Sequence, residues 1–162
     1  MEFSNQHLIL RLDHIKTLFE NHSDLLFEKQ EYVSLVSIKA KGRYKIKATL
    51  PLKDHEIYGE SVLFISEKLD ENGDIVQYHY GWELSQRERM KGKQLRHIMA
   101  FGNEDHSPGT NGWVKSNPFH HHHVPKNPKQ RKATDVDSLE IVISILEYYI
   151  STGKHYDSTH EF

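Results

Sequence analysis

The 162-residue chain contains no cysteine. This absence excludes a disulfide framework, a thiolate metal site and a thiol nucleophile, so any bound metal would need histidine and carboxylate ligands. The chain also lacks a long hydrophobic run. No segment approaches the roughly 18 apolar residues of a membrane span, and the N-terminus has no basic region followed by an apolar stretch. Together these absences predict a cytoplasmic protein without a membrane anchor.

Hydrophobic residues are sparse, at 36% of the chain, but seven Phe, eight Tyr and two Trp distinguish it from a disordered protein. A length of 162 residues suits one domain of ordinary size. We therefore predict a single domain over residues 1–153. A flexible C-terminal tail is expected over residues 154–162, where no apolar periodicity is left.

Two helices are predicted, one near each end of the chain, because apolar residues there recur every three or four positions. The first covers residues 7–20, with an extension to residue 27 left open. The second covers residues 136–150, begins after an N-cap at Thr134 or Asp135 and stops at Thr152-Gly153. Its apolar face is wider than one stripe, which indicates a well-buried helix or one shared with a partner, such as a second copy in a homodimer.

Between the helices, alternating apolar and polar residues predict about five strands. The Asn72-Gly73 step supplies the positive φ values of a tight hairpin turn between two of them. The predicted strands cover residues 32–41, 43–50, 61–69, 75–84 and 94–101. The order of helix, strands and helix predicts an α+β domain, in which an antiparallel sheet of about five strands carries an N-terminal and a C-terminal helix.

Positive charge is concentrated in one part of the chain. Residues 85–133 contain ten Lys and Arg against three acids, a net charge of +7, which leaves −9 for the remainder because the total is −2. Six of the thirteen histidines lie in the same window. A groove that gathers such cations attracts a nucleic-acid backbone, with an affinity that falls steeply with salt. The cations expected to bind nucleic acid are Arg87, Arg89, Lys91, Lys93, Arg96, Lys126, Lys129, Arg131 and Lys132.

Four consecutive histidines, His120 to His123, lie between Pro118 and Pro125 inside this basic window. On an extended segment His120 and His122 share one face, and His121 and His123 share the other. A His-x-His pair can give two ligands to zinc or a similar divalent ion, which makes His120 and His122 candidate metal ligands. The other ligands would come from elsewhere, with His79, His97, Asp105 and His106 as candidates.

A second chemistry needs no metal. One imidazole takes a proton from a ribose 2′-hydroxyl, another protonates the leaving oxygen, and nearby Lys or Arg stabilise the charge that develops on phosphorus. Imidazole suits both steps because its ordinary pKa of about 6.5 makes both protonation states accessible.

Surface or structural roles are the alternatives for each of these groups. The histidine run could be a polar surface loop that binds metal adventitiously. The lysines of the first hairpin could solvate the outside of a sheet and discourage edge pairing. His79 is interpreted as a structural cross-strand residue. Tyr78, Tyr80 and Trp82 share one strand face and could stack on bases, although a place in the core is favoured at this spacing.

The order of these features resembles the TumE family of prokaryotic toxin-antitoxin toxins, from the first helix to the last. The resemblance includes the basic first hairpin, the turn and strand from Leu69 to Tyr80, and the Asn103-Glu104-Asp105-His106 step. The run from Pro118 to Val124 is similar to the pattern Phe-Pro-His-His-x-His-Val, with its first two positions exchanged. The resemblance implies a growth-inhibiting toxin neutralised by a partner antitoxin. Its matching histidines are His106, His120, His121 and His123.

From these observations we predict an intracellular toxin that acts on RNA. The reaction centre would be formed by His106, His120, His121 and His123, and the basic residues would hold the RNA backbone. The predicted partners are a cognate antitoxin and RNA, without a membrane. Two alternatives stay open: a nucleic-acid-binding regulator without catalysis, and a metal-dependent enzyme or sensor that uses a His-x-His pair.

Overall fold

The computed structural model describes residues 6–25, 36–92, 97–103 and 138–157, together with the backbone of 121–123 and 131–133. A helix near each end of the chain encloses the strands, as predicted, and the strands are neighbours in the sheet in chain order. The helical elements are α1 (Gln6–Glu20), the 3-10 turn η1 (Ser23–Leu25), the short α3 (Gln86–Met90) and α4 (Leu139–Thr152). The strands are β1 (Ser37–Lys41), β2 (Lys45–Pro51), β3 (Ser61–Leu69), β4 (Ile75–Leu84), β5 (His97–Gly102), β6 (His121–His123) and β7 (Arg131–Ala133).

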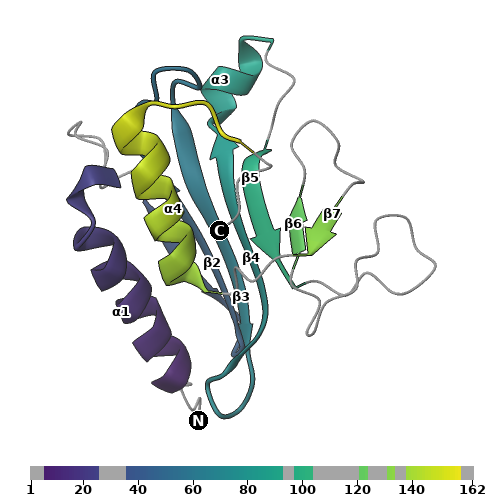
Figure 1. The fold of residues 1–162 in the computed structure, drawn as a ribbon. Helices are drawn as coiled ribbons and strands as arrows, with labels where there is room; N and C mark the ends of the chain where they lie inside the picture. The colour runs from purple at the N-terminus through teal and green to yellow at the C-terminus, as the bar shows by residue number, and fades with distance from the viewer. Residues whose placement is uncertain are drawn as a thin grey trace.

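The strands form one antiparallel sheet in the order β1-β2-β3-β4-β5-β6-β7. The predicted α+β class with an N-terminal and a C-terminal helix is confirmed. The five longer strands match the expected sheet, and the three-residue strands β6 and β7 extend it beyond β5 (Figure 1). The first predicted helix ends at Glu20 and is followed by the 3-10 turn, so the extension that the sequence left open is absent over residues 21–25.

Local sequence explains the best-predicted elements. In the turn between β3 and β4 the Asp70 side chain accepts hydrogen bonds from the N–H groups of Asn72 and Asp74, and Gly73 adopts a φ of 85°. Helix α4 stops at Gly153, which is left-handed as predicted. Its N-cap, however, is Ser138, whose Oγ accepts from the N–H of Ile141, rather than Thr134 or Asp135.

Helices α1 and α4 lie side by side across one face of the sheet (Figure 1). The core fills the space between the helices and this face. It includes Tyr78, Tyr80 and Trp82, which are at most 4% exposed. The Trp82 indole N–H donates to Ser61 Oγ at 2.9 Å, and its ring contacts Tyr149 of α4. The core interpretation of these three aromatic residues is therefore confirmed, and they are unavailable for stacking on bases.

After α4 the chain turns back onto the core. Tyr156 is 7% exposed, and its backbone N–H donates to the Tyr58 hydroxyl at 2.8 Å. Residues 158–162 of the expected tail lie outside the described residues. Among the helices of the described ranges, none combines the length and the apolar character needed to cross a membrane.

Candidate functional site on the outer face of the sheet

The face of the sheet turned away from α1 and α4, here called the outer face, carries the polar residues of interest. Side chains alternate along a strand, so residues next to buried Tyr80 and Trp82 belong to the outer face: His79, Gly81 and Glu83 of β4. Residues directly opposite one another on neighbouring strands share a face. The strand register therefore defines the rows of positions that cross this surface.

The central row of the outer face has small residues on β4 and β5. Gly81 of β4 is opposite Phe64 of β3 and Ala100 of β5, and Ala100 is in turn opposite position 123 of β6. In the next row His79 is opposite Gly102, which is opposite position 121. Small residues in these rows leave room above the backbone for polar groups from neighbouring positions.

Two polar side chains use that room. A Cβ atom added to Gly81 would lie 3.3 Å from Glu83 Oε2 and 3.5 Å from His79 Nε2, so both groups lean over this glycine. The His79 ring lies 6.1 Å from the His97 ring, centroid to centroid, and His97 Nε2 lies 3.7 Å from Glu83 Oε2. Two imidazoles and a carboxylate from β4 and β5 thus form one cluster.

The backbone brings part of the predicted histidine run to this cluster. In β6, His121 is opposite Gly102 and His123 is opposite Ala100, which places both positions in outer-face rows. Because neighbouring strands are about 4.8 Å apart, position 121 lies about 10 Å across the sheet from His79. The predicted sharing of one face by positions 121 and 123 agrees with this register.

The other predicted histidines are placed differently. Position 122 is opposite Phe101, which is buried on the helix side of the sheet. His106 and His120 lie outside the described residues, so the candidate metal pair of His120 and His122 is described at one backbone position alone. Within the ranges that the structure describes, no group of three or more histidine and acidic side chains has an arrangement that could hold a metal ion.

A pocket of about 460 Å³ lies at the α3 end of the outer face. Its lining includes Phe64 and Glu83, and also Arg87 and Arg89 from α3. Helix α3 was not predicted; it starts where the Ser85 Oγ accepts a hydrogen bond from the N–H of Glu88. The pocket adjoins the histidine cluster because two of its lining residues contact the imidazoles: Phe64 contacts the His79 ring, at 6.0 Å between centroids, and Glu83 contacts His97.

Further basic residues border the same surface. Lys47 of β2 is opposite Ser66, which is opposite His79, so the hairpin lysines share the outer face with the imidazoles. The exposed lysines at these outer-face positions of β1, β2 and β3 are Lys39, Lys41, Lys45, Lys47 and Lys68.

The structure describes some of the predicted nucleic-acid-binding residues. Arg87 and Arg89 line the pocket, and Lys91 Nζ pairs with Glu88 at 3.2 Å. Position 131 of β7 is opposite position 123, in the central row, whereas position 132 is opposite 122. Lys93, Arg96, Lys126 and Lys129 lie outside the described residues.

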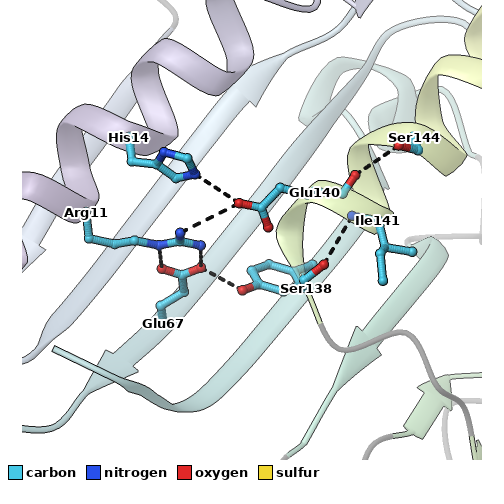
Figure 2. Close-up of polar contacts among 8 residues, drawn as sticks. Arg11, His14, Glu67, Ser138, Glu140, Ile141 and Ser144 are labelled. Carbon is cyan, nitrogen blue, oxygen red and sulfur yellow. Dashed lines mark hydrogen bonds and ion pairs between the residues drawn. The ribbon is translucent and has the colours of Figure 1, made fainter.

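A different polar cluster joins the helices to the inner face, and sequence reasoning missed it. Arg11 of α1 donates two hydrogen bonds to the Glu67 carboxylate, at 2.8 and 2.7 Å, and the Tyr80 hydroxyl donates a third at 2.6 Å (Figure 2). On α4, Glu140 lies 2.9 Å from His14 Nε2 and 4.0 Å from Arg11 Nη1. The Glu67 side chain is fully buried. Because the contacts join α1 to the sheet and to α4, this cluster is called the clamp.

The clamp perturbs the titration of its members. Burial alone would lower the pKa of Arg11. The hydrogen bonds to Glu67 and its negative charge outweigh this effect and raise the pKa of Arg11 above its ordinary value. Burial, followed by the negative charge of Glu67, raises the pKa of the Tyr80 hydroxyl above its ordinary value. For Glu140 burial acts in the opposite direction, yet the hydrogen bond from His14 and the nearby Arg11 leave its pKa lowered.

A sequence signal for the clamp did exist. Arg11 lies on the apolar stripe of α1, three residues after Leu8 and four before Ile15. Glu67 occupies the buried phase of β3, two residues after Ile65 and two before Leu69. Both residues therefore occupy positions at which the apolar periodicity predicts burial. Because a single buried charge is unstable, two opposite charges at such positions indicate a buried ion pair.

The fold and the outer face define a small α+β protein that combines a basic sheet surface with a histidine and carboxylate cluster. The family model described as Toxin TumE matches residues 15–152. The chain therefore belongs to the TumE toxin family. Searches of curated proteins and of solved structures found no match.

Proposed function

We propose that this chain is the toxin of a toxin-antitoxin system and that it acts on RNA at the outer face of the sheet. Membership in the TumE family supports the role as a toxin, which a cognate antitoxin would neutralise. The observation that carries the choice of RNA is the sharing of one face by imidazoles and cations. His79 and His97, positions 121 and 123, and the pocket arginines all belong to this face.

The proposed chemistry is cleavage of a phosphodiester by proton transfer. A neutral imidazole takes the proton of the ribose 2′-hydroxyl, the 2′-oxygen attacks the adjacent phosphorus, and a protonated imidazole supplies a proton to the departing 5′-oxygen. The products are a 2′,3′-cyclic phosphate and a free 5′-hydroxyl, so no external reactant is needed. Lysine and arginine side chains stabilise the charge that develops on phosphorus.

The proposed catalytic histidines are His120, His121 and His123 of the histidine run, together with His106. The register supports His121 and His123 by placing their backbone next to the row of His79. We add His79 and His97 to the set, because their rings contact each other and His79 Nε2 lies close to Gly81. The cations proposed to contact the RNA are Arg87, Arg89 and the outer-face lysines, supported by the exposed positions of these residues.

Labelled RNA incubated with the purified chain, with and without a chelator, tests the proposal. We expect cleavage that yields cyclic-phosphate ends and persists in chelator. Binding without cleavage would instead indicate a non-catalytic nucleic-acid-binding regulator. Cleavage that the chelator abolishes would indicate a metal-dependent enzyme with His120 and His122 as first candidate ligands.

A paired set of variants tests the site. His121→Ala combined with His123→Ala should abolish both RNA cleavage and growth arrest on induction. His7→Ala removes an exposed histidine of α1, on the opposite side of the sheet and outside the clamp, and serves as the control. Growth arrest that survives in the first double variant would contradict the assignment of the site.

A further inference from the structure

The pocket at the α3 end of the outer face has the chemistry of a site for a single base. Its volume of about 460 Å³ falls in the range of small-molecule sites, about 300–1,000 Å³. Apolar surface comes from Phe64 and Val62, both half-buried on β3. Charged groups of both signs converge on this apolar lining, which distinguishes the pocket from a purely cationic phosphate site.

The charged groups are paired in a way that a base edge can match. Arg87 Nη1 lies 3.8 Å from Glu60 Oε2, so a guanidinium donor and a carboxylate acceptor are next to each other at the rim. The Arg87 side chain is 72% exposed and that of Glu60 is 26% exposed. Because an exposed ion pair contributes little stability, an incoming ligand can replace it at little cost.

Among the RNA bases, guanine fits this pair best. Its N1–H and N2–H groups are adjacent donors for a carboxylate, and its O6 and N7 are adjacent acceptors for an arginine. Adenine offers acceptor N1 at the corresponding place and would be repelled by the carboxylate. Cytosine and uracil each lack part of the pattern, because neither has the purine N7 and neither has two adjacent donors.

The pocket lies next to the histidine cluster, so a base bound in it would be close to the proposed reaction centre. Phe64 and Glu83 belong both to the pocket lining and to the contacts of His79 and His97. An unstacked base held between Phe64 and the Glu60–Arg87 pair would therefore bring its own ribose and phosphate beside the histidine cluster. Arg89, at the same pocket, is exposed and can bind the neighbouring phosphate.

We infer that this pocket is a guanine-binding subsite that selects where along an RNA strand the toxin acts. The inference rests on the proposed action on RNA for its biological use, but the binding preference itself is independent of cleavage. Glu60 and Arg87 are the specificity-determining residues, and Phe64 supplies the stacking surface, which serves every base alike.

Calorimetric titration with the four nucleoside 5′-monophosphates tests the inference directly. We expect GMP to bind about tenfold or more tightly than AMP, CMP and UMP, the discrimination typical of one good bidentate contact. Glu60→Gln should remove most of this preference, whereas Glu71→Gln, in the exposed turn after β3, should leave it intact. Phe64→Leu should weaken all four nucleotides to a similar extent while retaining the GMP preference.

Equal affinity for the four nucleotides, or a GMP preference unchanged in Glu60→Gln, would overturn the inference. Circular dichroism and a melting curve of each variant verify folding, and Arg87→Lys provides a second probe of the pair should Glu60→Gln not fold. Cleavage mapping separates the two proposals. If the chain prefers GMP but leaves RNA intact, the guanine subsite is supported and the proposed nuclease activity is wrong. If the chain cleaves RNA without preference for guanosine, the nuclease activity is supported and the guanine subsite is wrong.

Discussion

Glu83 and His97 face each other across β4 and β5, with 3.7 Å between Oε2 and Nε2. The Glu83 side chain is 9% exposed and that of His97 is 36% exposed, so the carboxylate lies beneath the more accessible imidazole. Such a carboxylate orients the ring. Glu83 is therefore a positioning residue for the proposed proton transfer.

Substitutions of this pair should have separable effects on RNA cleavage. His97→Ala is expected to lower the rate about 100-fold or more, the usual loss when a general acid or base is removed. Glu83→Gln should lower kcat by less than His97→Ala and leave KM nearly unchanged, because the imidazole is still present but is oriented less well. Initial rates over a range of RNA concentrations measure both effects. A Glu83→Gln variant that raises KM and keeps the wild-type kcat would contradict the positioning role.

The clamp of α1 onto the sheet predicts a large loss of stability in one variant. Arg11→Met leaves the Glu67 carboxylate buried without its bidentate partner, which should lower the free energy of unfolding by about 3–5 kcal/mol. Combining Arg11→Met with Glu67→Leu should recover part of this loss, because the unpaired charge is then absent, although the buried Tyr80 hydroxyl loses its acceptor. Urea unfolding of the two single variants and the double variant measures the coupling. Additive losses would show that the two side chains act independently.

His55 predicts a dependence of stability on pH. Its Nδ1 accepts hydrogen bonds from the N–H groups of Ile57 and Tyr58, at 3.0 and 3.3 Å, and the residue is 3% exposed. Burial lowers its pKa despite opposing contributions from the carbonyls of Lys154 and Tyr149. The unfolded chain then takes up a proton more readily than the folded one as the pH falls below about 6.5.

The His55 contribution to stability is therefore complete above about pH 6.5 and decreases as the pH falls towards the lowered pKa of the folded state. Urea unfolding of the wild type between pH 7.5 and 5 should show a decline that is smaller in His55→Gln, which keeps an acceptor for the turn. His7→Gln, at an exposed position, should follow the wild type. Identical slopes in wild type and His55→Gln would argue against a lowered pKa.

Gly81 predicts a variant that folds but has an altered site. A Cβ at this position would lie 3.3 Å from Glu83 Oε2, closer than an ordinary contact, so the carboxylate has to move by a few tenths of an ångström. Gly81→Ala should therefore impair growth arrest and RNA cleavage more than it lowers the melting temperature. Gly42→Ala provides the contrast. It places an alanine in the left-handed region, which costs about 1–2 kcal/mol of stability, but the added Cβ has no atom within 4 Å. Normal activity in Gly81→Ala would show that the space above the glycine is not used.

Local sequence patterns predicted those helices, strands and turns that are specified by residues close together in the chain. The hairpin between Ser61 and Leu84 was placed with its observed bounds, since Asp70, Asn72 and Gly73 satisfy the turn by themselves. By contrast, the short helix after Ser85 was read as a basic stretch, because five residues are too few for a periodic signal. The start of α4 was misplaced by several residues because more than one capping residue precedes it.

The sequence by itself determined the fold class, the strand alternation and the clustering of cations and histidines in one part of the chain. The tertiary structure decided which of them meet. His79 lies 18 residues from His97 in the chain, yet pairing of β4 with β5 brings their rings to 6.1 Å, and pairing of β5 with β6 adds positions 121 and 123. Arg11 and Glu67 meet in the same way across 56 residues. A periodic pattern reports which face a residue prefers, whereas its partner on that face depends on strand order and register, which are set by the packing of the whole chain.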